Sequence, residues 1–215
     1  MRCRANVPSR VRRCQRFVSG RFVSGFTLIE LLLVVAILAV LTTVGVSFMS
    51  PGRQQQTGKL CQEKLQKTYI AMEIFANDHG GSFPGGIGAQ TSEDALDVLV
   101  PKYTADTSIF ICPDSKDAPL PAGESIRQRK ISYAYYAGRR MNDTQAPLMS
   151  DRQVNDRSKS AGETAFSTTG EPPGNNHRKS GGNILFTDGR VEFSPPSAQF
   201  PLAFDKSIVL LNPKP

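Results

Sequence analysis

An apolar run from Phe26 to Met49 constrains this chain more than any other feature of its sequence. Apart from Glu30, Gly45 and a few hydroxyl side chains, every residue in the run is apolar. As an α-helix rising about 1.5 Å per residue, it would be roughly 36 Å long, enough to cross a bilayer. An acid in such a helix costs about 2.5–3.5 kcal/mol at its centre and less near the interface. Glu30 is therefore expected to have a partner.

The residues before this run are strongly basic, and they account for the charge of the whole chain. Residues 1–25 contain no acidic residue and seven arginines, namely Arg2, Arg4, Arg10, Arg12, Arg13, Arg16 and Arg21. The chain has 26 Lys and Arg against 19 Asp and Glu, so removing these seven leaves 19 of each. The remainder is formally neutral, which argues against nucleic-acid binding. The positive-inside rule predicts a cytoplasmic N-terminus and an extracytoplasmic remainder.

The string Gly25-Phe26-Thr27-Leu28-Ile29-Glu30, with the basic leader and the apolar helix, resembles the N-terminal signature of type IV prepilins and of the pseudopilins of type II secretion systems. The resemblance covers residues 1–49, and the string matches without a gap. It implies that a prepilin peptidase cleaves the chain after Gly25 and that the new N-terminus, Phe26, is N-methylated.

A direct repeat in the leader makes Gly20 a second possible cleavage site, because residues 16–20 and 21–25 are identical. Cleavage after Gly25 places Glu30 at the fifth position of the mature chain. Cleavage after Gly20 would place a glycine there and would leave Arg21 before the apolar run. We therefore expect cleavage after Gly25.

The new amino group of a neighbouring subunit would neutralise Glu30. At roughly 4 Å and an effective dielectric of about 20, the pair is worth about 4 kcal/mol before desolvation. We expect Glu30 to set subunit register in a helical filament through a heterologous, non-closing contact. The alternative is that the protein is an ordinary membrane anchor, in which the Glu30 side chain extends to the membrane–water interface. A secretory signal is disfavoured, because its apolar core has only about 7–15 residues.

The remaining sequence predicts an α+β fold, in which a long N-terminal helix crosses the membrane with its first half and packs its second half on a small antiparallel sheet. The resemblance makes this fold pilin-like. We divide the chain into a leader (1–25), a transmembrane helix (26–50), an amphipathic helix (51–80) and a globular domain (81–215). Pro51 and Gly52 are expected to end or kink the membrane part. Helical spacing predicts one apolar face with Cys61, Leu65, Tyr69, Met72 and Ala76.

The globular domain is expected to contain a short helix after Ser92 and several antiparallel strands. The strand candidates are residues 108–112, 130–136, 164–168, 183–187, 190–193 and 207–211. Asp188-Gly189 is the clearest signal, because this pair is typical of a tight hairpin in which both turn residues take positive φ. Residues 139–163 and 170–182 are expected to be polar loops.

Two cysteines remain after the leader, Cys61 and Cys112. In an oxidising compartment they are a candidate disulfide, and two separate buried thiols are the alternative. The spacing matches no metal motif, because there is no Cys-x-x-Cys and the histidines, His79 and His177, lie far apart.

His177 precedes Asp188-Gly189 by a glycine-containing spacer, a pattern that resembles the C-terminal part of certain pseudopilin-like proteins. Phe110-x-Cys112-Pro113 and Cys61 before an amphipathic stretch fit the same group, although the spacer here is one residue longer. No role follows for His177, Asp188 or Gly189, and a hairpin with a loop histidine is the alternative.

The resemblance also suggests calcium, because major pseudopilins order a C-terminal loop with this ion. The candidate ligands are Asp143, Asp151, Asp156 and Asp188, although their spacing matches no EF-hand loop.

Catalysis is not expected from this sequence. His177 and Asp188 could serve as base and orienter, but neither Ser167 nor Ser180 lies in a Gly-x-Ser-x-Gly turn. Basic residues of segment 127–140 flank tyrosines and could bind single-stranded nucleic acid. The neutral charge after the leader argues against that role.

The sequence therefore predicts a non-enzymatic pseudopilin that assembles into a pseudopilus for type II protein secretion. Its expected location is the inner membrane, as a single-pass protein with an extracytoplasmic C-terminal domain. The expected partners are the prepilin peptidase and methyltransferase, other pseudopilin subunits, the inner-membrane assembly platform and lipid. The alternatives are a type IV pilus subunit and a membrane-anchored extracytoplasmic binding domain that does not polymerise.

Overall fold

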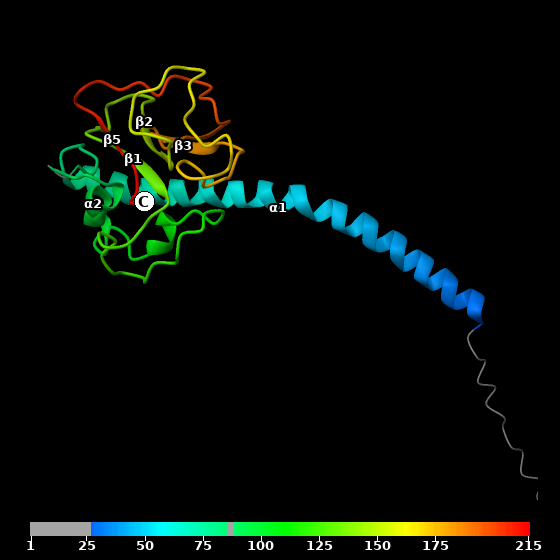
Figure 1. Cartoon of the computed structure of the whole chain (residues 1–215). Helices are drawn as coiled ribbons and strands as arrows, with labels where there is room; N and C mark the ends of the chain where they lie inside the picture. The colour runs from blue at the N-terminus through cyan, green and yellow to red at the C-terminus, as the bar shows by residue number, and fades with distance from the viewer. Residues whose placement is uncertain (1–26, 86–87) are drawn as a thin grey trace, which may run out of the picture. The chain divides into compact units, whose positions relative to one another are not determined.

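The computed structural model describes residues 27–85 and 88–215, and it describes no side chains for residues 42–55. Gly25 and Phe26 therefore lie outside the described residues. The chain forms two compact units, residues 1–48 and 49–215. One helix, α1 (Leu28–Asp78), contributes to both units and continues without a break through residues 51 and 52 (Figure 1). The predicted long N-terminal helix is therefore confirmed in its described part, and Pro51 does not end it.

Within the described residues, the first unit consists of the N-terminal part of α1. Its described apolar side chains, residues 28–41, are all exposed on the single chain. Across the described residues, with their gaps at 42–55 and 86–87, no helix is long and apolar enough to span a membrane. The predicted transmembrane segment, residues 26–50, includes residues outside this description and stays a prediction.

The second unit is built on a five-stranded antiparallel sheet with the order β4-β3-β2-β1-β5. Its strands are β1 (Tyr133–Ala137), β2 (Pro147–Asp151), β3 (Gly182–Phe186), β4 (Val191–Ser194) and β5 (Val209–Leu211). Tyr133 pairs with Asp151 across β1 and β2, and Ser150 pairs with Ile184 across β2 and β3. The predicted α+β class and antiparallel sheet are confirmed.

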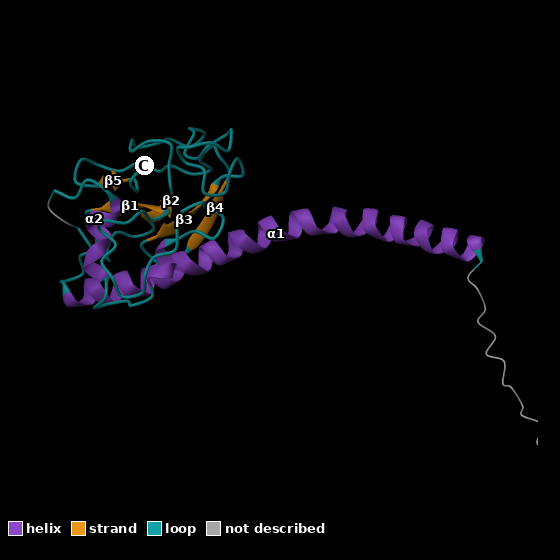
Figure 2. Ribbon diagram, turned by 60° about the horizontal axis from the view of Figure 1, so that its bottom comes forward, coloured by secondary structure: helices purple, strands orange, loops and turns teal. Residues whose placement is uncertain are grey.

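The C-terminal part of α1 packs against one face of this sheet (Figure 2). Four of the five residues of its predicted apolar face, Cys61, Leu65, Met72 and Ala76, are fully buried. They share a core cluster with the sheet residues Tyr133, Tyr135, Met149, Leu185 and Leu211. α2 (Ser92–Leu96) and the 3-10 helix η1 (Asp97–Leu99) close the same core and confirm the predicted short helix.

The opposite face of the sheet is buried as well, under irregular segments of the C-terminal part. Ile184 and Phe186 of β3 pack with Phe166 and Leu202, while Ala134 and Tyr136 of β1 pack with Ile208 and Leu210. A strand that is covered on both faces does not alternate between apolar and polar residues. This explains why the tyrosines of β1 are all fully buried.

Several predicted elements differ from the structure. Residues 107–110 form the 3-10 helix η2 (Thr107–Phe110), because the Asp106 side chain accepts a hydrogen bond from the Ser108 amide and favours a turn over a strand. Residues 164–168 form only an isolated bridge, from Thr164 to Ser197. The central strand β2 was expected to be loop, because its only apolar residues besides Pro147 are Leu148 and Met149.

The β3–β4 hairpin is confirmed, but its turn is not of the predicted two-residue kind. The Gly189 amide donates to the Phe186 carbonyl at 3.0 Å, and the Phe186 amide donates to the Arg190 carbonyl at 2.9 Å. Gly189 has φ +81°, whereas Asp188 is not left-handed. This is a three-residue loop, in which a turn is followed by one left-handed glycine.

Gly182 provides a test of how closely the sheet is covered. A Cβ atom there would lie 2.6–2.8 Å from the ring of the fully buried Phe166, whereas at Gly58 of α1 no described atom lies within 4 Å. We expect Gly182→Ala to lower the free energy of unfolding by about 1–3 kcal/mol through overpacking. Gly58→Ala should raise it by up to about 1 kcal/mol, because alanine favours the helix.

Urea unfolding of the full chain in detergent, followed by near-ultraviolet circular dichroism of its tyrosines, measures both changes. Equal free energies of unfolding for the two variants would contradict the described covering of β3.

Candidate functional site

Four titratable side chains from distant parts of the chain meet in the core between α1 and the sheet. Cys61 lies on α1, Cys112 follows η2, Asp151 ends β2 and His177 lies in the loop before β3. All four are at least 97% buried. One ligand atom from each lies within 4.8 Å of the ligand atoms of the other three. We call this set the Cys–Asp–His cluster.

The two thiols are in contact but not bonded. Their sulfur atoms lie 3.1 Å apart, and both cysteines are free. Cys61 Sγ also lies 3.1 Å from the Tyr133 hydroxyl and 3.5 Å from Asp151 Oδ1. Of the two alternatives, a disulfide or two buried thiols, this structure shows two buried thiols that lie in contact.

The imidazole of His177 is held from both of its nitrogens. Nε2 faces the cluster, 3.2 Å from Asp151 Oδ2 and 3.5 Å from Cys112 Sγ. Nδ1 lies 3.3 Å from Asp114 Oδ2 on the opposite side of the ring. Asp114 therefore fixes the ring orientation and directs Nε2 at the other three side chains.

Asp151 is almost completely enclosed by hydrogen-bond donors. Its Oδ1 accepts a bond of 2.7 Å from the Asn176 side-chain amide. Its Oδ2 accepts bonds from the backbone amide of Asn183 at 2.6 Å and from the Asn183 side chain at 3.1 Å. Strand β3 places Asn183 beside the end of β2, so the sheet register itself positions these donors.

The electrostatics of the cluster favour the charged forms of Asp151 and His177 in spite of burial. Burial alone would raise the pKa of Asp151, but His177 and the amide donors lower it below its usual range. Burial alone would lower the pKa of His177, but Asp151 raises it to about 11. The hydrogen bond from Cys61 lowers the pKa of Cys112 to about 7. Burial raises the pKa of Cys61 well above its ordinary value.

The cluster corrects the predicted partners of His177 and the predicted calcium ligands. His177 pairs with Asp151 and Asp114, not with Asp188, whose carboxylate instead accepts from the Arg190 amide at 3.1 Å. Among the described residues, the Cys–Asp–His cluster is the only group of three or more such side chains that could hold a metal. The four aspartates do not come together, because Asp143, Asp156 and Asp188 lie outside it.

Gly189 has a packing role beside α1. A Cβ atom at this position would lie 2.9 Å from the Tyr69 ring, whose hydroxyl donates to the Thr187 carbonyl at 3.0 Å. The Asp-Gly turn thus lets the hairpin rest directly on the helix.

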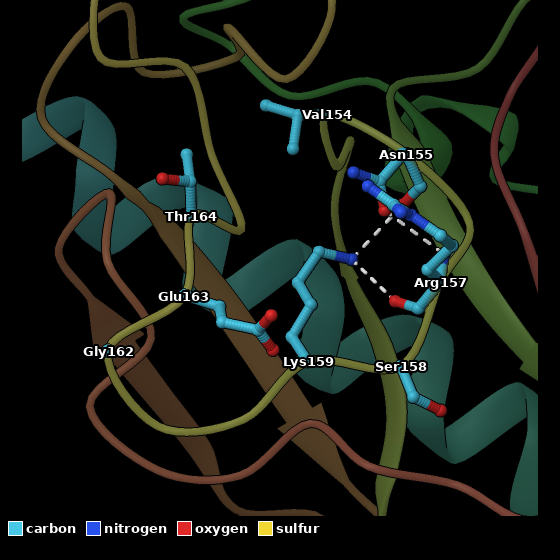
Figure 3. A pocket seen from close by; sticks show the side chains of 8 residues that line it. All are labelled: Val154, Asn155, Arg157, Ser158, Lys159, Gly162, Glu163 and Thr164. Atoms are coloured by element: carbon cyan, nitrogen blue, oxygen red, sulfur yellow. Dashed lines mark hydrogen bonds between the residues drawn. The ribbon is translucent and has the colours of Figure 1, made fainter.

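A surface hollow of about 360 Å³ lies elsewhere in the second unit, around Lys159 (Figure 3). Its lining residues are Val154, Asn155, Arg157, Ser158, Lys159, Gly162, Glu163 and Thr164. The ammonium of Lys159 donates to the Gln153 side chain and to the carbonyls of Asn155 and Arg157, at 2.7, 3.1 and 2.8 Å. An ammonium group has three N–H donors, and all three of those of Lys159 bond to acceptors of the same chain.

Glu30 has a partner within its own chain. Its carboxylate accepts bonds of 2.9 Å from both the amide and the hydroxyl of Thr27, and its own amide donates to the Thr27 hydroxyl at 3.3 Å. This reciprocal arrangement is a capping box, which satisfies free amides at the start of α1. The sequence pattern Thr-x-x-Glu before an apolar run would have predicted it.

Comparison with known proteins finds a match, and it lies near the N-terminus. Residues 21–46 match a family model described as a prokaryotic N-terminal methylation motif, and this range includes Gly25, Phe26 and Glu30. No curated protein and no solved structure matches the chain. The motif indicates a type IV pilin-like, prepilin-type protein with a membrane-anchored N-terminal segment, which implies processing by a prepilin peptidase and assembly with other pilin-like subunits.

Proposed function

We propose that this protein is a pseudopilin, which is cleaved after Gly25, methylated at Phe26 and assembled into a pseudopilus for type II protein secretion. The observation that carries the proposal is the methylation motif at residues 21–46. In the proposed role the protein is non-enzymatic, and its C-terminal unit lies outside the cytoplasm. Its partners are the peptidase, other pseudopilin subunits, the inner-membrane assembly platform and lipid.

The exposed apolar part of α1 supports assembly. Leu28, Ile29 and Leu31 are 81%, 74% and 61% exposed, and the apolar side chains that follow up to Leu41 are also exposed. A helix that is apolar on all sides is normally covered by lipid or by other helices. Before assembly lipid would cover this stretch, and in a filament neighbouring copies of the same helix would replace it.

The capping box favours a second candidate function, a membrane-anchored domain that does not polymerise. Because Thr27 already satisfies the Glu30 carboxylate, Glu30 has a structural role that requires no neighbouring subunit. A type IV pilus subunit is the other alternative, and it shares the processing step and the assembly step with the pseudopilin.

Processing can be tested at the repeated leader. We expect the mature protein in its native host to begin at Phe26 and to carry one N-terminal methyl group. Edman sequencing and mass spectrometry of the purified protein measure both. Gly25→Val should block cleavage, whereas the matched change Gly20→Val, in the preceding repeat, should leave it intact. A mature chain that begins at Arg21, or that keeps its leader, would contradict the proposal.

The role of Glu30 can be separated from the capping box with two substitutions. Glu30→Gln removes the charge but keeps a side chain that can complete the box. Thr27→Ala removes the hydroxyl and keeps the charge, at a cost of about 1 kcal/mol to the helix. We expect Glu30→Gln to reduce cross-linked multimers in host membranes at least about tenfold, which corresponds to about 1.4 kcal/mol.

Thr27→Ala should form multimers nearly as well as the unmodified protein. Equal multimer yield from Glu30→Gln would favour the non-polymerising anchor. A loss in Thr27→Ala as large as that in Glu30→Gln would assign the defect to the helix cap.

A further inference from the structure

We propose that Cys61, Cys112, Asp151 and His177 bind one Zn²⁺ ion, which fastens helix α1 to the sheet. The four residues come from α1, the segment after η2, β2 and the loop before β3, so a single ion would join every layer of this core. Their ligand atoms lie within 4.8 Å of one another, and all four side chains are buried.

The type of donor selects the metal. Two cysteine sulfurs, one imidazole nitrogen and one carboxylate oxygen suit zinc, whereas calcium and magnesium prefer oxygen ligands alone. Four protein ligands complete a tetrahedron and leave no position for water or substrate. The proposed site is therefore structural and not catalytic.

Four of the distances between donor atoms are close to the edges of a zinc tetrahedron, and the other donor pairs lie within 4.8 Å. The two sulfurs are 3.1 Å apart, Cys112 Sγ is 3.5 Å from His177 Nε2, His177 Nε2 is 3.2 Å from Asp151 Oδ2, and Asp151 Oδ1 is 3.5 Å from Cys61 Sγ. Zinc bonds of about 2.0–2.3 Å give tetrahedral edges of about 3.3–3.8 Å. The two sulfurs would have to separate by about 0.7 Å to admit the ion, whereas the other three distances are already close to those of a zinc site.

The surrounding contacts are those of an oriented metal site. A zinc-binding histidine usually donates its second ring N–H to a carboxylate, and Asp114 lies 3.3 Å from Nδ1 of His177. The Tyr133 hydroxyl lies 3.1 Å from Cys61 Sγ, where it can donate to a thiolate. The amides of Asn176 and Asn183 donate to Asp151 and fix its carboxylate. These donors would also stabilise the net negative charge of two thiolates and a carboxylate around a divalent cation.

A disulfide explains fewer of these observations. It would use the two sulfurs alone, and it would give no reason for an imidazole and a carboxylate to be buried against them. The metal uses all four side chains and gives Asp114 its role. On binding, the ion would replace the protons of both thiols and the Nε2 proton of His177, which are released to solvent.

The metal content of the full chain tests the proposal. We expect one Zn²⁺ per chain by elemental analysis after purification in detergent without chelators. Exchange for Co²⁺ should give the visible ligand-field bands of tetrahedral cobalt and a thiolate-to-cobalt charge-transfer band. His177→Gln should lose the zinc and these bands. The matched control is His79→Gln, which changes an exposed histidine stacked on Phe75 and should keep one zinc.

A milder variant keeps the test decisive if His177→Gln fails to fold. Asp114→Asn leaves all four ligands in place, and Asp114 is partly exposed, so this variant should fold. Competition with a chelator should show zinc affinity lowered about 10- to 100-fold.

Three results would overturn the proposal. One is a protein without zinc in which peptide mapping finds Cys61 linked to Cys112. Another is a reduced protein that takes up neither Zn²⁺ nor Co²⁺. The third is full zinc content in the double variant Cys61→Ser, Cys112→Ser, which would place the ion elsewhere.

Discussion

A buried carboxylate at the end of β2 is the constraint on which the second unit depends. An ionised group in a protein interior is costly unless partners surround it. The chain supplies those partners to Asp151 from the loop that carries Asn176 and His177 and from the first residues of β3. The helix must then present a small polarisable side chain at this point, and Cys61 does so. The register of the sheet, the course of the loop and the rotation of the helix are thus linked through one side chain.

The two units meet different physical demands. The second unit buries its apolar residues on both faces of a small sheet, so its stability comes from within the chain. The described part of the first unit exposes its apolar residues, and the side chains of Thr27 and Glu30 cap its first turn. Its apolar surface must be covered by something outside the chain. A protein that folds one half by itself and completes the other half with lipid or with neighbours is suited to anchoring and to assembly.

The elements that the sequence predicted correctly are those marked by residues close to one another in the chain. The apolar face of α1 and the hairpin around Asp188-Gly189 were both predicted from neighbouring residues. Strand β2 was missed because its position depends on the strands on either side and not on its own few apolar residues. Residues 108–112 looked like a strand, but the side chain of Asp106 determines a turn there.

The Cys–Asp–His cluster could not be predicted from spacing, because its members come from four separate segments. Motif searches detect ligands that are neighbours in the chain, such as Cys-x-x-Cys, and here no two of them are. Each member was singled out, but with an incomplete or a wrong set of companions. Cys61 was matched with Cys112 alone, His177 with Asp188, and Asp151 with the loop aspartates. Only the folded chain brings the correct companions together, since Asp151 at the end of β2 meets Cys61 of α1 and His177 of the loop before β3.

The capping box at the start of α1 bears on how readily a filament of such subunits would come apart. An incoming amino group would not meet a bare carboxylate, since Thr27 already donates to Glu30. Docking would therefore exchange one set of hydrogen bonds for another, and its net free energy would be smaller than that of the isolated ion pair. A subunit leaving the filament would recover its internal bonds at once. The free-energy difference between a docked and a released subunit would then be smaller than the ion pair alone suggests.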